Sequence, residues 1–71
     1  MMNKTEKIIL KRAELEGKEF IEKGASKSSV AFFITGIAKG VEMYKEEIGK
    51  ENGVDFWKAM EKLTIKFIKN S

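Results

Sequence analysis

The chain of 71 residues contains no cysteine, no histidine, no proline and no glutamine. Without cysteine it forms no disulfide and has no thiolate ligand, and without histidine it lacks the commonest zinc ligand and the commonest general base. Carboxylates are the only side chains left to bind a metal, and they suit hard cations. Because no activated nucleophile or tunable base can be named, we predict a protein that is not an enzyme, with no catalytic residue, cofactor or metal.

The absence of proline favours long, uninterrupted helices. Strict alternation of apolar and polar residues, which predicts strands, never persists beyond a few positions. Glycine, serine and asparagine instead separate three helical segments, which we predict over residues 4–23, 29–48 and 53–69. Asn3 and Glu6 form a capping-box pattern at the first segment, and Gly24 and Gly49 are placed to end the first two. Residues 1–71 are therefore predicted to form a single all-α domain.

The small size of the chain bears on how it is stabilised. A domain of this length buries a marginal core, and such proteins usually rely on disulfides, a metal or self-association. Disulfides and thiolate metal sites are excluded by composition, so self-association is the remaining way to stabilise the fold. We predict a three-helix bundle with segment 29–48 at its centre, completed by homodimerisation.

Charge and hydropathy exclude two further classes of protein. Fourteen basic and eleven acidic residues give a net charge of +3, and the excess is spread evenly rather than concentrated in a nucleic-acid-binding arm. The longest apolar run covers residues 30–38, which is too short to span a bilayer and too far from the start for a secretion signal. We therefore predict a cytoplasmic protein without a membrane span.

Segment 29–48 carries the most apolar surface. Six residues at alternating spacings of four and three form a seam that is typical of helix packing. Further apolar residues extend this surface around two thirds of the helix, which predicts partners on more than one side. The seam consists of Val30, Ile34, Ile37, Val41, Tyr44 and Ile48.

Two glycines inside the same segment need an explanation. Gly36 and Gly40 should each cost about 1 kcal/mol relative to alanine in a helix, so a close helix contact is expected to offset the cost. That contact could be internal, against Ala13 and Gly17, or it could join two copies of the chain. The predicted self-association surface comprises Phe32, Phe33, Gly36, Gly40 and Met43, with Ile8 and Leu15 as a second line.

The other two segments have narrower apolar stripes. The third packs through Phe56, Met60, Leu63 and Phe67, widened by Trp57, Thr64 and Ile68. The first packs through Ile9, Leu10, Ala13, Gly17, Phe20 and Ile21. Glu14, Glu16, Glu19 and Glu22 also lie on the first segment, where lysines 11, 18 and 23 are expected to pair with them on the surface.

A row of lysines on the third segment supports an alternative function. Lys58, Lys62, Lys66 and Lys69 span roughly 16 Å at the rise of an α-helix, so they could follow a phosphate backbone while Trp57 stacks on a base. Acidic neighbours, Glu61 and Asp55, would weaken this field. The segment contains no arginine, the residue that base-reading contacts prefer.

These patterns favour a binding protein over an enzyme. We predict a small protein–protein interaction module, a homodimer that acts as an inhibitor or regulator by docking on a larger protein. The alternative is a small basic regulator that binds nucleic acid through the lysine row of the third segment.

Overall fold

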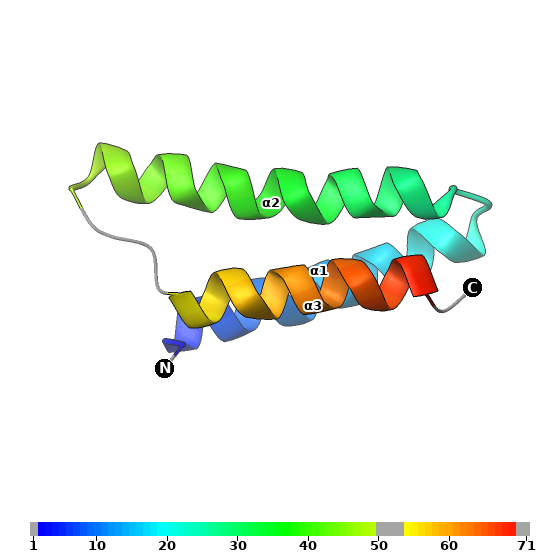
Figure 1. The fold of residues 1–71 in the computed structure, drawn as a ribbon, viewed down its shortest axis with the longest axis horizontal. Coiled ribbons are helices and arrows are strands. Elements are labelled where there is room, and N and C mark those ends of the chain that lie inside the picture. Colours follow the sequence, from blue (N-terminus) through cyan, green and yellow to red (C-terminus); the bar gives the residue numbers. More distant parts are fainter. Residues whose placement is uncertain (1, 50–53, 70–71) are drawn as a thin grey trace.

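The computed structural model describes residues 2–49 and 54–69, which form three α-helices. They are α1 (Lys4–Glu22), α2 (Lys27–Glu47) and α3 (Val54–Lys69). Each helix contacts the other two, with α1 and α3 side by side and α2 lying along both (Figure 1). No strand occurs among the described residues. The predicted three-helix bundle is confirmed for this part of the chain, although the helices surround one shared core and α2 does not separate the other two.

Local capping explains where α1 and α2 begin. The Asn3 side chain accepts the Glu6 N–H at 2.8 Å, and the Glu6 carboxylate accepts the Asn3 N–H at 3.0 Å, so the predicted capping box is confirmed. The Ser26 hydroxyl accepts the Ser29 N–H at 3.1 Å. Because Ser26 supplies this cap, α2 begins at Lys27, two residues earlier than predicted. For the third helix the sequence offers Asn52 or Asp55 as the cap; Asn52 lies outside the described residues, and Asp55 lies within the first turn of α3.

Glycines end the first two helices as predicted. Gly24 and Gly49 have φ angles of +95° and +73°, in the left-handed region that side chains disfavour. The N–H of Gly24 donates to the Ile21 carbonyl at 3.0 Å, and the N–H of Ala25 donates to the Phe20 carbonyl at 2.9 Å. This pair of hydrogen bonds is the Schellman motif, which satisfies the last carbonyls of α1 and turns the chain towards α2.

The hydrophobic core confirms the four main residues of the α3 stripe but not Ile68, which is 50% exposed, and it confirms the α2 seam only in part. Val30 and Ile34 are buried, but Tyr44 and Ile48 at the end of the seam are exposed. The buried line on α2 continues instead through Ala38, which follows Ile34 at the same spacing of four. A row of this spacing inclines across the helix surface, as expected where neighbouring helices cross at an angle. The core consists of Ala13, Val30, Ile34, Ala38, Phe56, Met60, Leu63 and Phe67.

α1 contributes a small-residue face to this core. Gly17 is buried, and a Cβ atom placed on it would lie 2.9 Å from Phe67 Cζ and 3.2 Å from Val30 Cγ1. The absence of a side chain at Gly17 therefore lets α2 and α3 approach α1 closely. At the end of α1, the rings of Phe20 and Phe33 meet edge to face with centroids 5.1 Å apart. None of the described helices is long and apolar enough to cross a membrane.

Candidate functional site

The face of α2 that points away from the bundle is apolar and uncovered. We define the α2 outer face as Phe32, Phe33, Gly36, Gly40, Met43 and Tyr44. Phe32, Met43 and Tyr44 are 78%, 61% and 66% exposed. Single exposed apolar side chains are common on protein surfaces, but several together on one face are typical of an interaction site. Sequence reasoning identified this face except for Tyr44, which it assigned to the inner seam.

No described residue of the subunit packs against the side-chain position of either glycine of this face. A Cβ atom placed on Gly36 or Gly40 would meet nothing within 4 Å. The internal explanation, in which they pack against Ala13 and Gly17, is therefore wrong, because Gly17 faces Phe67 and Val30 instead. Among residues 2–49 and 54–69, no close contact at these positions offsets the cost of Gly36 and Gly40 to helix stability.

Phe33 connects the α2 outer face to α1. Its ring is partly buried and meets the Phe20 ring edge to face, a geometry that favours a fixed position for both rings. Further along α2, a groove between α1 and α2 is lined by residues that include Ile9, Gly40 and Tyr44. The apolar surface therefore continues from the α2 outer face towards α1.

The second predicted line does not join this surface. Ile8 and Leu15 are both exposed on α1. Their neighbours Ile9 and Leu10 line the grooves towards α2 and α3, respectively. At 100° per residue, Ile8 and Leu15 thus point away from both neighbouring helices. They form a separate apolar line on the far side of α1.

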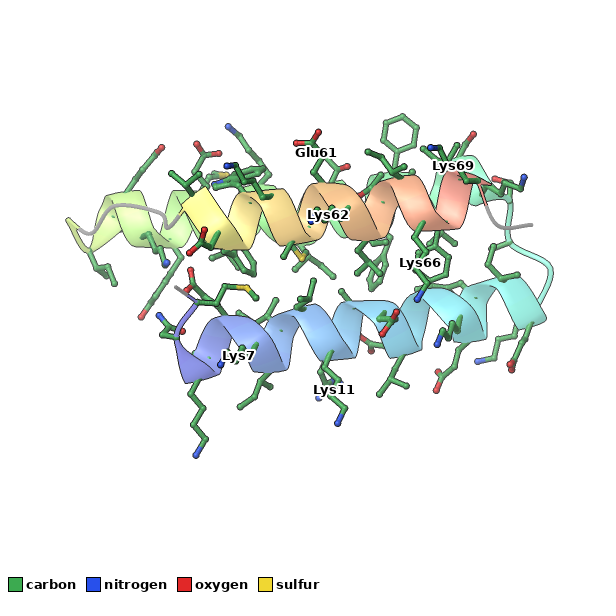
Figure 2. All side chains as sticks on the ribbon, turned by 60° about the horizontal axis from the view of Figure 1, so that its bottom comes forward. Lys7, Lys11, Glu61, Lys62, Lys66 and Lys69 are labelled. Carbon is green, nitrogen blue, oxygen red and sulfur yellow. The ribbon has the colours of Figure 1, made fainter. Side chains whose placement is uncertain are left out.

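Of the predicted α3 lysines, Lys62 and Lys66 face α1 and lie opposite two lysines there, whereas Lys58 and Lys69 do not line this groove. Lys62 and Lys66 line a groove between α1 and α3 together with Lys7 and Lys11 (Figure 2). We call these four residues and the groove between them the α1–α3 lysine groove. Its remaining lining residues are Leu10, Glu14, Ala59 and Leu63. Sequence reasoning identified the lysines of α3 but missed those of α1, because only the packing of the two helices brings them together.

Trp57 and Glu61 lie on a different side of α3 from this groove. Both line a hollow between α2 and α3, next to Ile34 and Ala38. Trp57 is therefore not placed to stack on a base bound among the lysines, contrary to the role that we predicted for it. The carboxylate of Glu61 also points away from Lys62 and Lys66 (Figure 2). Glu61 therefore weakens the positive electrostatic field of these lysines less than the sequence indicated.

Acidic residues of α1 find partners across the bundle. Lys66 Nζ lies 2.6 Å from Glu14 Oε2, and this hydrogen bond lowers the pKa of the Glu14 carboxyl. The expected partners of Glu14 on its own helix, the lysines at 11 and 18, are not the ones that bind it. Arg12 Nη2 lies 3.6 Å from Glu16 Oε1 on the surface, a pair of the kind that contributes little to stability.

A second pair, between Glu6 and Lys45, joins α1 to α2 in a nearly buried position. Lys45 Nζ donates to Glu6 Oε2 at 2.8 Å, and the two side chains are 16% and 6% exposed, respectively. The hydrogen bond from Lys45 and that from the Asn3 backbone lower the pKa of the Glu6 carboxyl, despite its burial. Sequence reasoning assigned Glu6 only to the capping box. The one sequence signal was its position, one turn before Ile9 and Leu10 on the apolar stripe of α1.

The described residues include no group of three or more acidic side chains placed to hold a metal ion. Comparison with known protein families, curated proteins and solved structures finds no match to this chain. Function is therefore inferred from the residues and their geometry.

Proposed function

We propose that this chain is a small non-catalytic protein–protein interaction module that associates with a second copy of itself through the α2 outer face. The observation that carries the proposal is the pair of open glycines, Gly36 and Gly40, lying between exposed aromatic side chains. Each glycine costs helix stability, and no contact with the described part of the subunit offsets this cost. A second helix seated against these positions would use the close approach that they allow.

The arrangement of side chains fits a two-fold contact. Phe32, Gly36, Gly40 and Tyr44 follow one another at spacings of four, so they form one ridge on α2. The ridge is large at both ends, small in the middle and symmetric about residue 38. A two-fold axis requires a self-complementary patch. In an antiparallel pair centred there, the glycines of the two copies meet and Phe32 lies opposite Tyr44 of the partner subunit.

The exposed area sets the expected strength of association. Phe32, Met43 and Tyr44 offer on the order of 300–500 Å² per copy, since large side chains bury about 150–250 Å² each and these are about two-thirds exposed. A stable complex of standard size buries about 800 Å² per partner. The contact would bury about 600–1,000 Å² over both copies, which is below the range of stable specific interfaces, so we expect a weak dimer that dissociates on dilution.

Replacing Phe32 with glutamate should abolish self-association, because a charge would then be buried where the two copies meet. The wild-type chain should sediment as a dimer at hundreds of micromolar and dissociate on dilution, whereas Phe32→Glu should remain a monomer throughout. Leu15→Glu is the matched control, since Leu15 is exposed on α1 and the change in charge is the same. A wild-type chain that stays monomeric at the highest concentration, or equal effects of the two variants, would contradict the proposal.

Alanine at both Gly36 and Gly40 should have opposite effects on folding and association. In a monomer at low concentration, each substitution should raise the free energy of unfolding by about 0.5–1 kcal/mol, because alanine favours the helix and the added methyl meets no atom. The same methyl groups should hold two copies apart and weaken the dimer. Denaturant unfolding and sedimentation measure the two effects separately. If the double variant associated as tightly as the wild type, the two glycines would not lie in the contact between the copies.

Docking on a larger protein, in the role of inhibitor or regulator, stays a prediction of the sequence. In a dimer formed through the α2 outer face, Ile8 and Leu15 of α1 remain exposed. That line is the surface left for such a partner.

A further inference from the structure

The α1–α3 lysine groove gathers four ammonium groups from two neighbouring helices. Lys7 and Lys11 are four residues apart on α1, and Lys62 and Lys66 are four apart on α3, so each pair is spaced about 6 Å along its helix. Lys58 and Lys69 extend the α3 row to about 16 Å. From this placement, we propose that the groove binds the phosphate backbone of duplex nucleic acid.

Few acidic groups oppose these lysines. Glu14 is the carboxylate among the residues described along the groove, and it is bound to Lys66. Asp55 lies about one turn before Lys58 on α3, while Glu61 lines the hollow on the α2 side of that helix. Even with Lys66 neutralised by Glu14, the groove keeps three lysines whose charge is unmatched by an acidic lining residue.

The lining of the groove favours phosphate over an acidic helix as the partner. An amphipathic helix docks by burying its apolar side chains in an apolar groove. Here the two large apolar lining residues are Leu63, which is 6% exposed, and Leu10, which is partly buried, so a docked helix would find little apolar surface to bury. Binding must therefore come from charge, and neutralising phosphates with lysine releases counterions without requiring apolar contact.

The same lining favours a duplex over a single strand. Proteins that hold single strands stack bases on aromatic side chains, but the residues described along this groove include no aromatic ring, and Trp57 lies on the α2 side of α3. Counterion release per phosphate is also larger for a duplex. Lysine contacts to phosphate carry no sequence information. The expected binding is therefore independent of base sequence.

The first test is the salt dependence of binding to a labelled 20-base-pair DNA duplex, followed by fluorescence anisotropy. Three lysines with unmatched charge predict that the logarithm of affinity falls with the logarithm of salt concentration at a slope of about −2.7. Affinity should then drop about 40-fold between 50 and 200 mM salt. A single strand of the same length should bind more weakly. Failure to bind the duplex at 50 mM salt, or tighter binding of the single strand, would overturn the proposal.

Two double lysine variants of equal net charge distinguish binding by the groove from attraction by the overall charge of the protein. Lys11→Gln with Lys62→Gln should weaken duplex binding at 50 mM salt at least about tenfold and make the slope shallower by about 1.8. Lys23→Gln with Lys39→Gln has the same net charge and lies outside the groove, so affinity should change less than about twofold if the lysines act by contact. Equal losses in the two variants would show attraction by net charge alone and overturn the proposal.

Two further probes test the class of partner. Vesicles containing anionic phospholipid and a polyglutamate peptide each present negative charge without a duplex backbone. Binding of either one at 50 mM salt more tightly than the duplex would overturn the proposal in favour of that partner. The groove contains no residue of α2, so this result and the self-association result are independent.

Discussion

Replacing Phe56 with alanine should lower the free energy of unfolding by about 3–5 kcal/mol. Phe56 is fully buried in the first turn of α3, and it is the largest of the fully buried side chains. Removing its ring forfeits the transfer of apolar surface out of water and leaves a cavity. A domain of this size has a total stability of roughly 4–11 kcal/mol. The variant should therefore be largely unfolded at 37 °C or unfold at much lower urea concentration than the wild type.

Phe32→Ala is the matched control for this prediction. The chemical change is the same, but Phe32 is mostly exposed on α2. At a concentration where the chain is monomeric, this variant should change the free energy of unfolding by no more than about 0.5 kcal/mol. Urea unfolding followed by circular dichroism measures both. If the two variants lowered the free energy of unfolding by similar amounts, Phe56 of α3 would not be a main contributor to the core.

The four buried residues of α3 could be predicted because that helix has one buried face. Phe56, Met60, Leu63 and Phe67 recur at spacings of four and three, and all four are buried. The helix ends of α1 could be predicted for a similar reason, since capping by Asn3 and termination at Gly24 depend on residues that are adjacent in sequence. Both features are local, so a single sequence contains the information that determines them.

The pattern of α2 was ambiguous because apolar residues cover most of its circumference. The sequence predicted a seam ending at Ile48, whereas the buried line passes through Ala38, because the direction of the neighbouring helices decides which residues are covered. The same ambiguity concealed whether Gly36 and Gly40 faced inward. Their exposure depends on where α1 and α3 lie, and these positions are set by packing over the whole bundle.

The lysine groove and the Glu6–Lys45 pair escaped prediction because their members are far apart in the sequence. Glu6 and Lys45 are separated by 39 positions, and Lys66 lies 52 positions from Glu14. Helical periodicity places each residue on a face of its own helix but does not say which face of another helix it meets. The two proposed binding surfaces nevertheless use different helices. A dimer joined through α2 would therefore present two copies of the α1–α3 lysine groove.

Replacing Lys45 with methionine should lower the free energy of unfolding at pH 7 by about 1.5–3 kcal/mol. The substitution keeps most of the apolar stem but removes the ammonium group that binds the Glu6 carboxylate at 2.8 Å. Glu6 would then be left as a buried charge without its cross-helix partner, which is the costly way to break such a pair. Lys39→Met is the control, since Lys39 pairs with Glu42 on the exposed surface of α2, and no measurable loss is expected from it.

The pH dependence of the Lys45→Met effect identifies its cause. The pKa of the Glu6 carboxyl is lowered in the folded chain by the hydrogen bonds from Lys45 and the Asn3 backbone. A lowered folded pKa stabilises the fold above the unfolded value of about 4.5, and this contribution is lost as the pH falls through the folded pKa. The pKa of Glu14 is lowered as well, so both proteins should lose stability in acid. The difference between wild type and Lys45→Met should therefore be constant near neutral pH and shrink below about pH 4.5. A difference that keeps its size down to pH 3 would show that Lys45 stabilises the bundle by packing and not through the charge of Glu6.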